Sequence, residues 1–376
     1  MGKKIIRCAT IGMSLNIFCK DILTELKAQG YDVVALSSPD NDLKELAQRE
    51  QVRTIGVPME RRISLFKDFR SLWQLIKVFR KENPDMVHSM TPKAGLLCMI
   101  AAWLTRVPVR MHTFTGLVWP TSTGLKRQIL MMTDRITCAC ATHVIPEGQG
   151  VLNDLAAHIT SKPMKVLGYG NIRGIDLSYW DRASLKKEDP FTFLFVGRIV
   201  GDKGINELVS AFAKLGVRSE ESGIHCRLVL VGMYENELDP VSAETRRQID
   251  TMPEIEVVGP QYGEDLKAWY ANADCFVFPS YREGFPNTVI EAGAMELASI
   301  VTDINGSREI VVDGETGVII PSKDADAILE AMTWMMEHDE ERRAMGRKAR
   351  KVVAERFEQG FVREQLYGFY REVLAE

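Results

Sequence analysis

The sequence predicts an α/β protein made of two doubly wound domains, each with a parallel sheet covered by helices on both faces. Short apolar runs typical of buried strands alternate with amphipathic segments typical of helices along the chain. The chain has 376 residues, which is more than one average domain. A polar stretch without strand pattern, residues 176–189, separates the two alternating sets and is expected to be the linker.

The first alternating set predicts six strands with helices between them. The strands are expected at residues 5–11, 33–36, 54–57, 85–88, 109–113 and 142–145. The helices are expected at residues 14–30, 43–49, 67–81, 93–105 and 125–140, with Ser14 as a cap of the first. The triplet Asp40-Asn41-Asp42 imitates a metal-binding motif, but it opens a predicted helix, where Asp is a common cap, so we interpret it as structural.

The second alternating set predicts six further strands. They are expected at residues 191–196, 227–231, 256–258, 275–278, 300–302 and 318–320. The stretch at 357–374 is amphipathic and predicts a closing helix. In doubly wound folds ligands bind at the carboxyl ends of the strands, so the site is expected in a cleft at those ends of the two sheets.

Composition narrows the function classes. The net charge of −4 argues against nucleic acid as the main partner. Seven cysteines, odd in number and scattered, predict reduced thiols rather than a disulfide framework. The apolar run at 94–104 is too short to span a membrane, and Arg7 interrupts the segment that resembles a signal peptide. A cytoplasmic protein is therefore expected.

Charged side chains gather in two predicted loops of the second half. Glu283 and Glu291 flank a helix start at Pro286, expected to be the first helical residue, and a helix start attracts anions while carboxylates accept sugar hydroxyls. Arg198 and Lys203 lie in the glycine-rich loop after the strand at 191–196, where two cations could clamp a diphosphate. Taken alone, each pattern is more often only a surface helix or a solvated loop with ordinary charges.

The residues around these charges resemble glycosyltransferase family four. The resemblance rests on PSYREGFPNTVIEA (residues 279–292), on GRIVGDKG (197–204) and on DINGSREIVVDGETGVIIP (303–321). PDMVHSMTPKAGLL (84–97) and VPVRMHTFTG (107–116) are similar to the subset that builds bacterial capsule, O-antigen or lipid-linked oligosaccharides. This resemblance implies a retaining enzyme with the GT-B fold. The block around His88 departs from that subset, because Met90 stands where a second His is frequent.

The resemblance implies a donor site in the second domain. Arg198, Lys203 and the amides of Gly284 and Phe285 would hold the diphosphate. Glu291 would hold the ribose, and Glu283 the hydroxyls of the donor sugar. The remaining implied substrate-binding positions are Asn287 and the backbone around the base, Val258 and Gly259.

The resemblance also implies a site in the first domain. His112 matches the His near the transferred sugar, although a lone strand His is more often structural. The loop with Gly12 and Ser14 would close over donor phosphates or acceptor. His88 and Lys93 are further candidates; Lys93 could also be only a charge at a helix start. The catalytic set is thus expected to be His112, Glu283, Arg198 and Lys203.

The function expected is transfer of a sugar from a nucleotide diphosphate, UDP above all, to a glycan or undecaprenyl-diphosphate-linked acceptor in surface polysaccharide synthesis. No cofactor and no metal are expected. The expected domains are 1–180 for the acceptor and 181–356 for the donor, with a final helix at 357–376 that crosses back to the first. Two alternatives stay open: another GT-B enzyme, such as a nucleotide-sugar epimerase or phosphorylase, or a non-catalytic sugar-nucleotide-binding protein.

A basic stretch adds a membrane hypothesis. Arg and Lys at positions 61, 62, 67, 70, 77, 80 and 81 are interleaved with large apolar side chains between Leu65 and Phe79. This pattern fits a helix with a solvated basic face, and equally a peripheral contact with anionic lipid on the inner face of the membrane.

Overall fold

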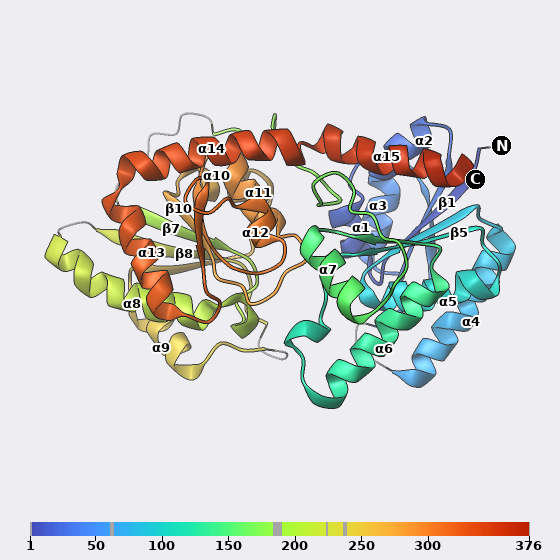
Figure 1. Ribbon diagram of the computed structural model, residues 1–376, viewed down its shortest axis with the longest axis horizontal. Coiled ribbons are helices and arrows are strands. Elements are labelled where there is room, and N and C mark those ends of the chain that lie inside the picture. The colour runs from blue at the N-terminus through green and yellow to red at the C-terminus, as the bar shows by residue number, and fades with distance from the viewer. Residues whose placement is uncertain (1, 61–63, 183–189, 223–224, 236–238, 376) are drawn as a thin grey trace. The chain divides into compact units, whose positions relative to one another are not determined.

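The computed structural model describes residues 2–60, 64–182, 190–222, 225–235 and 239–375 (Figure 1). Arg61 and Arg62 of the basic stretch, and residues 183–189 of the expected linker, lie outside the described residues. The chain forms two compact units. Unit 1 comprises Met1–Gly174 with Gln359–Glu376, and unit 2 comprises Ile175–Glu358.

Unit 1 contains a six-stranded parallel sheet in the order β3-β2-β1-β4-β5-β6. This is the strand order of doubly wound dinucleotide-binding folds. Successive strands are added toward one edge of the sheet up to β3 and toward the opposite edge from β4 onward, so the switch point lies between β1 and β4. Its strands are β1 (Lys4–Cys8), β2 (Asp32–Ser37), β3 (Arg53–Gly56), β4 (Met86–Met90), β5 (Val109–Phe114) and β6 (His143–Pro146). The helices are α1 (Gly12–Phe18), α2 (Ile22–Ala28), α3 (Asn41–Glu50), α4 (Leu65–Glu82), α5 (Pro92–Leu104), η1 (Trp119–Thr121), α6 (Gly124–Cys140), α7 (Gln149–His158) and α15 (Gln359–Ala375).

Unit 2 repeats this topology. Its sheet is parallel in the order β12-β11-β10-β7-β8-β9, which is the same arrangement with its switch point between β7 and β10. Its strands are β7 (Phe191–Val196), β8 (Cys226–Val231), β9 (Ile255–Gly259), β10 (Cys275–Phe278), β11 (Ala298–Thr302) and β12 (Gly317–Ile320). The helices are η2 (Gly201–Lys203), α8 (Ile205–Ser222), α9 (Ala243–Thr251), α10 (Gly263–Ala271), α11 (Asn287–Ala294), α12 (Ser307–Ile310), α13 (Ala325–Glu337) and α14 (Asp339–Phe357).

The central strands are buried on both faces. All residues of β4, β7 and β10 are buried, as expected when helices cover both sides of a parallel sheet (Figure 1). Separate apolar clusters fill the two sides of the unit 1 sheet: one contains Ile5 and Leu26, the other Ile6 and Leu75. Neighbouring residues of β1 thus belong to opposite layers, as the twofold repeat of a strand requires. The predicted α/β fold with two doubly wound sheets is confirmed.

Two local predictions were wrong. The helix expected from Ser14 to Gly30 is two helices, α1 and α2, because the chain turns at Asp21, whose φ is +65°. Ser14 therefore lies inside α1 and does not cap it; Ile11 holds the cap position. Pro286 likewise precedes α11 as its cap residue, with an extended ψ of 108°, and the helix begins at Asn287. Asp40 does cap α3, since its side chain accepts the amide of Leu43 at 2.8 Å.

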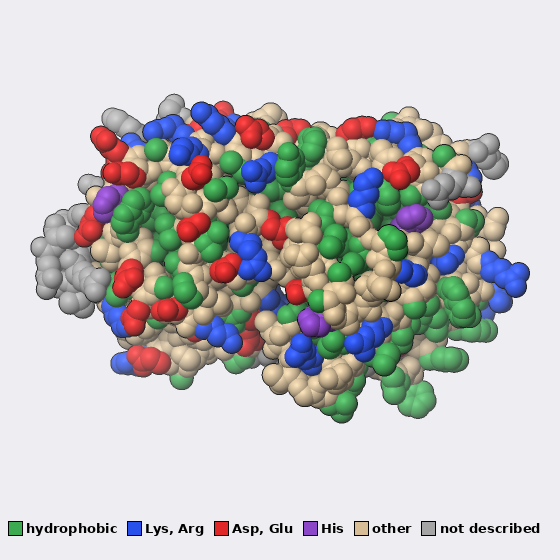
Figure 2. Space-filling view, viewed as in Figure 1, with side chains coloured by type: hydrophobic (Ala, Val, Ile, Leu, Met, Phe, Trp, Pro, Cys, Tyr) green, Lys and Arg blue, Asp and Glu red, His purple; other side chains and the backbone are tan. Residues whose placement is uncertain are grey.

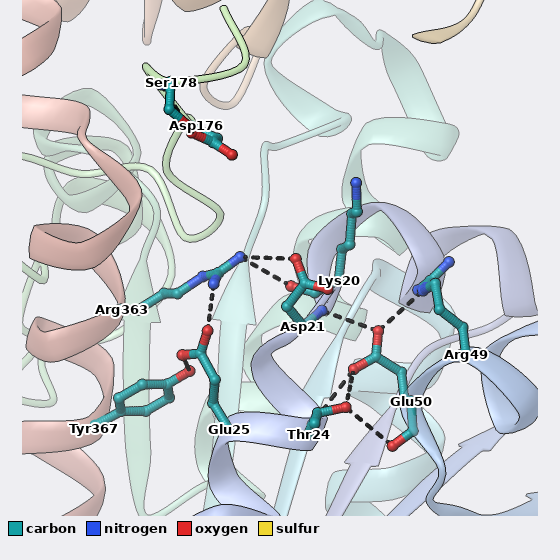
Figure 3. A network of polar contacts seen from close by, with 10 residues as sticks. All are labelled: Lys20, Asp21, Thr24, Glu25, Arg49, Glu50, Asp176, Ser178, Arg363 and Tyr367. Carbon is teal, nitrogen blue, oxygen red and sulfur yellow. Dashed lines mark hydrogen bonds and ion pairs between the residues drawn. The ribbon is translucent and has the colours of Figure 1, made fainter.

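The last helix belongs to unit 1, where α15 lies beside α2 (Figure 1). Figure 3 shows the polar contacts that fix it: Arg363 pairs with Glu25 and donates to the carbonyl of Lys20, and the hydroxyl of Tyr367 donates to Glu25 at 2.5 Å. Glu50, buried at the end of α3, accepts the amide of Asp21 at 2.9 Å. These bonds hold the turn between α1 and α2 against α15.

Candidate functional site

Unit 2 collects the predicted donor residues at one edge of its sheet. Arg198 follows β7, Val258 and Gly259 end β9, and Glu283 lies in the loop between β10 and α11. Because all strands are parallel, their carboxyl ends meet along the same edge. The topology therefore brings together side chains that are far apart in sequence.

Lys203 and Glu283 are in direct contact. The ammonium group of Lys203 forms an ion pair with the carboxylate of Glu283, which also accepts the hydroxyl of Ser280 at 2.8 Å. Both side chains are mostly buried, with 14% and 16% of their surface exposed. Gly204 makes the approach possible. Its φ is +71°, and a Cβ there would lie 2.1 Å from the carbonyl oxygen of Pro279.

A network of hydrogen bonds joins the two loops that carry Lys203 and Glu283. The amide of Tyr281 donates to the carbonyl of Asp202 at 2.8 Å, and the guanidinium of Arg282 binds the Asp202 carboxylate at 2.8 Å. The hydroxyl of Tyr281 donates to both oxygens of Glu207 at the start of α8, at 2.7 and 2.6 Å. The sequence analysis missed these supporting residues, because nothing in a single loop reveals which other loop it meets.

Arg198 is the more exposed cation, with 47% of its side chain accessible. Its guanidinium pairs with Glu235, which follows β8, and not with Glu283. Gly232 allows the backbones after β7 and β8 to touch, since a Cβ there would lie 1.8 Å from the carbonyl oxygen of Gly197. An anionic ligand would have to compete with Glu235 for this guanidinium.

Glu291 lies within α11 and is buried. The hydroxyl of Tyr270 donates to its carboxylate at 3.2 Å. The amides of Gly284 and Phe285 make no hydrogen bond within the described part of the chain, which leaves two donors just before a helix start. Asn287 is the first residue of that helix.

Two further loops border this region. Gly306, after β11, has a φ of +77°, and a Cβ there would lie 2.4 Å from the carbonyl oxygen of Gly284, so the two loops pack backbone to backbone. Gly259 also has a positive φ, of +71°, and its carbonyl accepts the amide of Gly232. The carbonyl of Val258 accepts the side-chain amide of Gln261 at 2.9 Å.

In unit 1, His112 lies near the carboxyl end of β5 and lines a small pocket. The ring is only 1% exposed, and burial lowers its pKa to about 3, so the imidazole is neutral at physiological pH. Its Nδ1 shares a hydrogen bond of 2.8 Å with the hydroxyl of Ser89. Gly95 packs against the ring, and a Cβ there would lie 2.4 Å from its Cε1.

His88 occupies a different environment. It is buried, its Nε2 shares a bond of 2.7 Å with the hydroxyl of Thr113, and its Nδ1 contacts both Tyr370 and the guanidinium of Arg7. Burial, with Arg7 next, holds the pKa of His88 well below its usual range. These contacts give His88 a role in packing β1, β4, β5 and α15 together; its predicted role in substrate binding stays a prediction.

The other unit 1 candidates are held by neighbours. The amide of Gly12 donates to the carboxylate of Asp40 at 2.9 Å, and a Cβ at Gly12 would lie 2.4 Å from the amide of Leu43. Ser14, two positions after the start of α1, is half-buried. Lys93, near the start of α5, pairs with Asp68 at 2.7 Å. Their roles in binding also stay predictions.

The structure adds residues that the sequence analysis did not consider. Trp119 and Asp134 line the same pocket as His112, together with Thr113 and Phe114. Among the described residues, no three His, Cys, Asp or Glu side chains gather as they would around a metal ion. None of the helices that the structure describes is both long and apolar enough to cross a membrane.

Two Rossmann-type units with the 3-2-1-4-5-6 strand order, each with polar side chains at the carboxyl edge of its sheet, are the architecture of the GT-B fold. Solved structures have the same fold. Sucrose-phosphate synthase from Thermosynechococcus elongatus matches with a TM-score of 0.82 and 22% identity over 99% of both chains. HepE from Anabaena, solved with UDP, matches with a TM-score of 0.79 and 16% identity over 99% of this chain and 100% of that one.

The family follows from sequence comparison. The model described as glycosyl transferases group 1 matches residues 179–352, and the glycosyl transferase 4-like domain matches residues 15–170. The capsular polysaccharide biosynthesis glycosyltransferase CapM of Staphylococcus aureus is 33% identical over 100% of this chain and 98% of its own. An Escherichia coli enzyme, UDP-Gal:alpha-D-GlcNAc-diphosphoundecaprenol alpha-1,3-galactosyltransferase, is 29% identical over 75% of this chain and 74% of its own. The chain therefore belongs to the family of these group 1 and 4-like glycosyltransferases, and it is a glycosyltransferase.

Proposed function

We propose that this enzyme transfers a sugar from a UDP-sugar, with retention of configuration, to a lipid-linked glycan during the synthesis of a surface polysaccharide. The names of the two relatives support the process and the kind of acceptor. HepE, solved with UDP-glucose, supports the kind of donor. The observation that carries the proposal is the contact between Lys203 and Glu283 beside the amides of Gly284 and Phe285.

This arrangement suits a sugar bound to a diphosphate. Lys203, Arg198 and the two amides would neutralise the charge that develops on the leaving diphosphate. Glu283, paired with Lys203, would accept hydrogen bonds from hydroxyls of the sugar that the same diphosphate carries. Glu291, held by Tyr270, would receive the ribose hydroxyls. One loop would thus align both halves of the donor.

Retention requires that the acceptor attack from the face on which the diphosphate leaves. In the proposed step the glycosidic oxygen–carbon bond breaks, the acceptor oxygen forms its bond on that face, and a diphosphate oxygen takes the hydroxyl proton. The side chains position the reactants and stabilise charge. His112 is neutral because of its low pKa, so it can serve there as a hydrogen-bonding group rather than as a cation.

A donor screen followed by product analysis tests the proposal. Thermal unfolding is measured with UDP-, GDP- and dTDP-sugars, since a ligand at a hundred times its Kd stabilises by ~2.7 kcal/mol. The donor found is then incubated with polyprenyl-diphosphate-linked N-acetylglucosamine, and the product anomer is assigned by NMR. We expect a UDP-sugar and a retained anomer, with full turnover in EDTA. An inverted product, or turnover that needs Mn²⁺, would overturn the proposed mechanism.

We further propose that unit 1 docks on an anionic membrane. α4 packs on α5, and α5 on α6. These three helices expose a set of large apolar side chains, here called the apolar patch: Leu65, Phe66, Phe69, Trp73, Trp103, Leu104, Leu125, Ile129, Met132 and Ile136. Figure 2 shows hydrophobic side chains projecting in the region of α4 and α6, with Lys and Arg nearby.

Charge on the same helices specifies the lipid. Lys67 and Arg70 alternate with Phe66, 93% exposed, and Phe69, 72% exposed, on the first turns of α4. Apolar rings that enter the headgroup layer, with cations at the level of the phosphates, are typical of helices that lie in a membrane interface. Such docking would bring the enzyme to an acceptor anchored by a polyprenyl chain.

A further inference from the structure

The pocket beside His112 lies inside unit 1, at the carboxyl ends of β4 and β5. Thr91 follows β4, Phe114 ends β5, and Trp119 and Asp134 come from η1 and α6. The inner volume is about 20 Å³, which admits one water-sized group and excludes a whole sugar ring. This pocket, the Asp134 pocket, is therefore a place for a single substituent of a larger ligand.

The indole N–H of Trp119 is a hydrogen-bond donor that lacks an acceptor among the described residues. The side chain is 2% exposed, and its indole Nε1 has no hydrogen-bond partner among the described residues. Buried N–H groups are paired in the great majority of proteins, so this orphan needs an explanation. The ring itself is fixed by its edge-to-face contact with His158, at 5.3 Å between centroids, and by the guanidinium of Arg127 at 5.7 Å.

Asp134 supplies the matching acceptor. Among the residues that the structure describes, its carboxylate makes no ion pair, and the indole N–H of Trp119 interacts with it without reaching the geometry of a hydrogen bond. Burial raises the pKa of this carboxyl to about 7, and the polar interaction with the indole N–H of Trp119 lowers it. The titratable and charged groups around the pair are His112 on β5, Arg127 and Cys138 on α6, and His158 on α7.

Trp119 and Asp134 both line this small volume, so a hydrogen-bond donor and an acceptor lie side by side at it and favour a group that can donate and accept. A hydroxyl donates its proton to a carboxylate and accepts an N–H at the same time. An amine only donates when protonated, and a phosphate would be repelled by the carboxylate. The Asp134 pocket therefore has the polarity and the size of a hydroxyl-bearing substituent, and His112 lies beside it.

We propose that the Asp134 pocket receives one hydroxyl of the acceptor sugar, and that Asp134 and Trp119 determine which acceptor the enzyme accepts. The assignment rests on the proposed function, because it presumes transfer to a sugar. It goes further by naming the residues that read the acceptor. Water filling the same pocket without any sugar contact is the competing outcome.

The first test separates acceptor recognition from donor recognition. Asp134→Asn keeps the size of the side chain and removes its charge; Glu45→Gln, at an exposed position of α3, is the matched control. With polyprenyl-diphosphate-linked N-acetylglucosamine, Asp134→Asn should raise the acceptor KM at least tenfold and leave the UDP affinity and the donor KM unchanged. Unchanged acceptor KM, or equal losses for donor and acceptor, would overturn the assignment.

The second test identifies the hydroxyl. Acceptors that each lack one hydroxyl are compared with the complete acceptor in the wild type and in Asp134→Asn. With the wild type, kcat/KM should fall at least tenfold for one of the deoxy acceptors. With Asp134→Asn, kcat/KM for that deoxy acceptor should equal the value for the complete acceptor. Equal losses in both proteins would contradict the proposal. Absence of any transfer would be a failure of the proposed function instead.

A third measurement does not depend on turnover or on the variant folding. The indole ¹⁵N–¹H signal of Trp119 in the wild-type chain is followed while the same acceptor is added in the presence of UDP. A saturable shift is expected, because the orphan N–H gains a partner. A signal that does not move while the acceptor binds, as seen by calorimetry, would mean that only water occupies the pocket.

Discussion

Lys203 and Glu283 form an ion pair although 80 positions separate them in the chain. The pair lies where η2 meets the loop before α11, and the hydroxyl of Ser280 donates to the same carboxylate oxygen that Lys203 contacts. An unliganded cation that is already paired is fixed in position, so little side-chain freedom remains to be lost when phosphate arrives. The same pairing means that removing either partner leaves a charge behind.

The first prediction concerns the diphosphate clamp, by which we mean Arg198 and Lys203. Lys203→Ala and Arg198→Ala should each reduce kcat/KM roughly 10- to 100-fold, because charge-assisted bonds contribute ~1.5–3 kcal/mol. The Lys203 variant should also lose stability, since Glu283 is mostly buried and would be unpaired. Lys214→Ala is the control: that lysine is exposed on α8 and pairs with the exposed carboxylate of Asp326. If both variants keep the wild-type kcat/KM, the loop that carries Arg198 and Lys203 does not bind the diphosphate.

The second prediction is that the carboxylates of Glu283 and Glu291 contribute to the binding of different parts of the donor. Glu291→Gln should weaken binding of UDP itself, since the proposed partner is the ribose. Glu283→Gln should leave UDP binding within about threefold and weaken the intact UDP-sugar by roughly tenfold, the cost of a charged hydrogen bond. Isothermal calorimetry with UDP and with the UDP-sugar measures both. Equal loss for UDP in the two variants would contradict the assignment.

Gly95 offers a test of His112 that leaves the ring in place. Gly95→Ala puts a Cβ 2.4 Å from the imidazole Cε1, so the ring must move. Overpacking of this kind typically costs ~1–3 kcal/mol, and transfer should fall at least tenfold. Gly368→Ala on α15 is the matched control in the same unit: the nearest atom to its Cβ is 3.8 Å away, and the change should stabilise by ~0.5–1 kcal/mol. Full activity in Gly95→Ala would show that the position of His112 does not matter.

Asp134 makes stability depend on pH in a defined window. Its pKa is raised from 3.8 to about 7 by burial, so the folded state holds a proton that the unfolded state has already lost. Stability should therefore fall as pH rises from about 4 to 7, by at most ~1.4 kcal/mol per unit. Urea unfolding at pH 5 and pH 8 measures this. Asp134→Asn cannot ionise, so its free energy of unfolding relative to the wild type should be higher at pH 8 than at pH 5. If the difference in free energy of unfolding between the two proteins is the same at both pH values, the carboxylate is solvated and its pKa is not raised.

Membrane docking should depend on the apolar patch. The double variant Phe66→Ser with Phe69→Ser should reduce binding to vesicles of phosphatidylglycerol at least tenfold in a flotation assay, because both rings are largely exposed and available for insertion. Tyr262→Ser, which removes an aromatic ring that is 72% exposed in unit 2, should bind as the wild type does. Equal binding to neutral and anionic vesicles would leave the basic residues without a role.

The fold class could be predicted from the sequence, and so could the two loops that we propose to hold the donor. Buried parallel strands are read as short apolar runs, and the motifs around Arg198, Lys203, Glu283 and Glu291 are contiguous, so both signals are local. Helix boundaries could not be read in the same way, because some of them depend on distant residues. Nothing in the residues near Ser14 reveals that Asp21 adopts a left-handed turn, because Glu50, 29 positions further on, accepts its amide.

The tertiary structure alone decided which side chains meet. His88 and His112 look alike in the sequence, two strand residues near predicted carboxyl ends. Folding bonds the first to Tyr370, 282 positions away, and places the second at a pocket with Trp119 and Asp134. Asp134 lies on an amphipathic helix that shows no motif, and its pKa is raised by burial, which exists only in the folded chain. Burial and pairing are properties of the packed sheet and helices, and a local pattern carries no record of them.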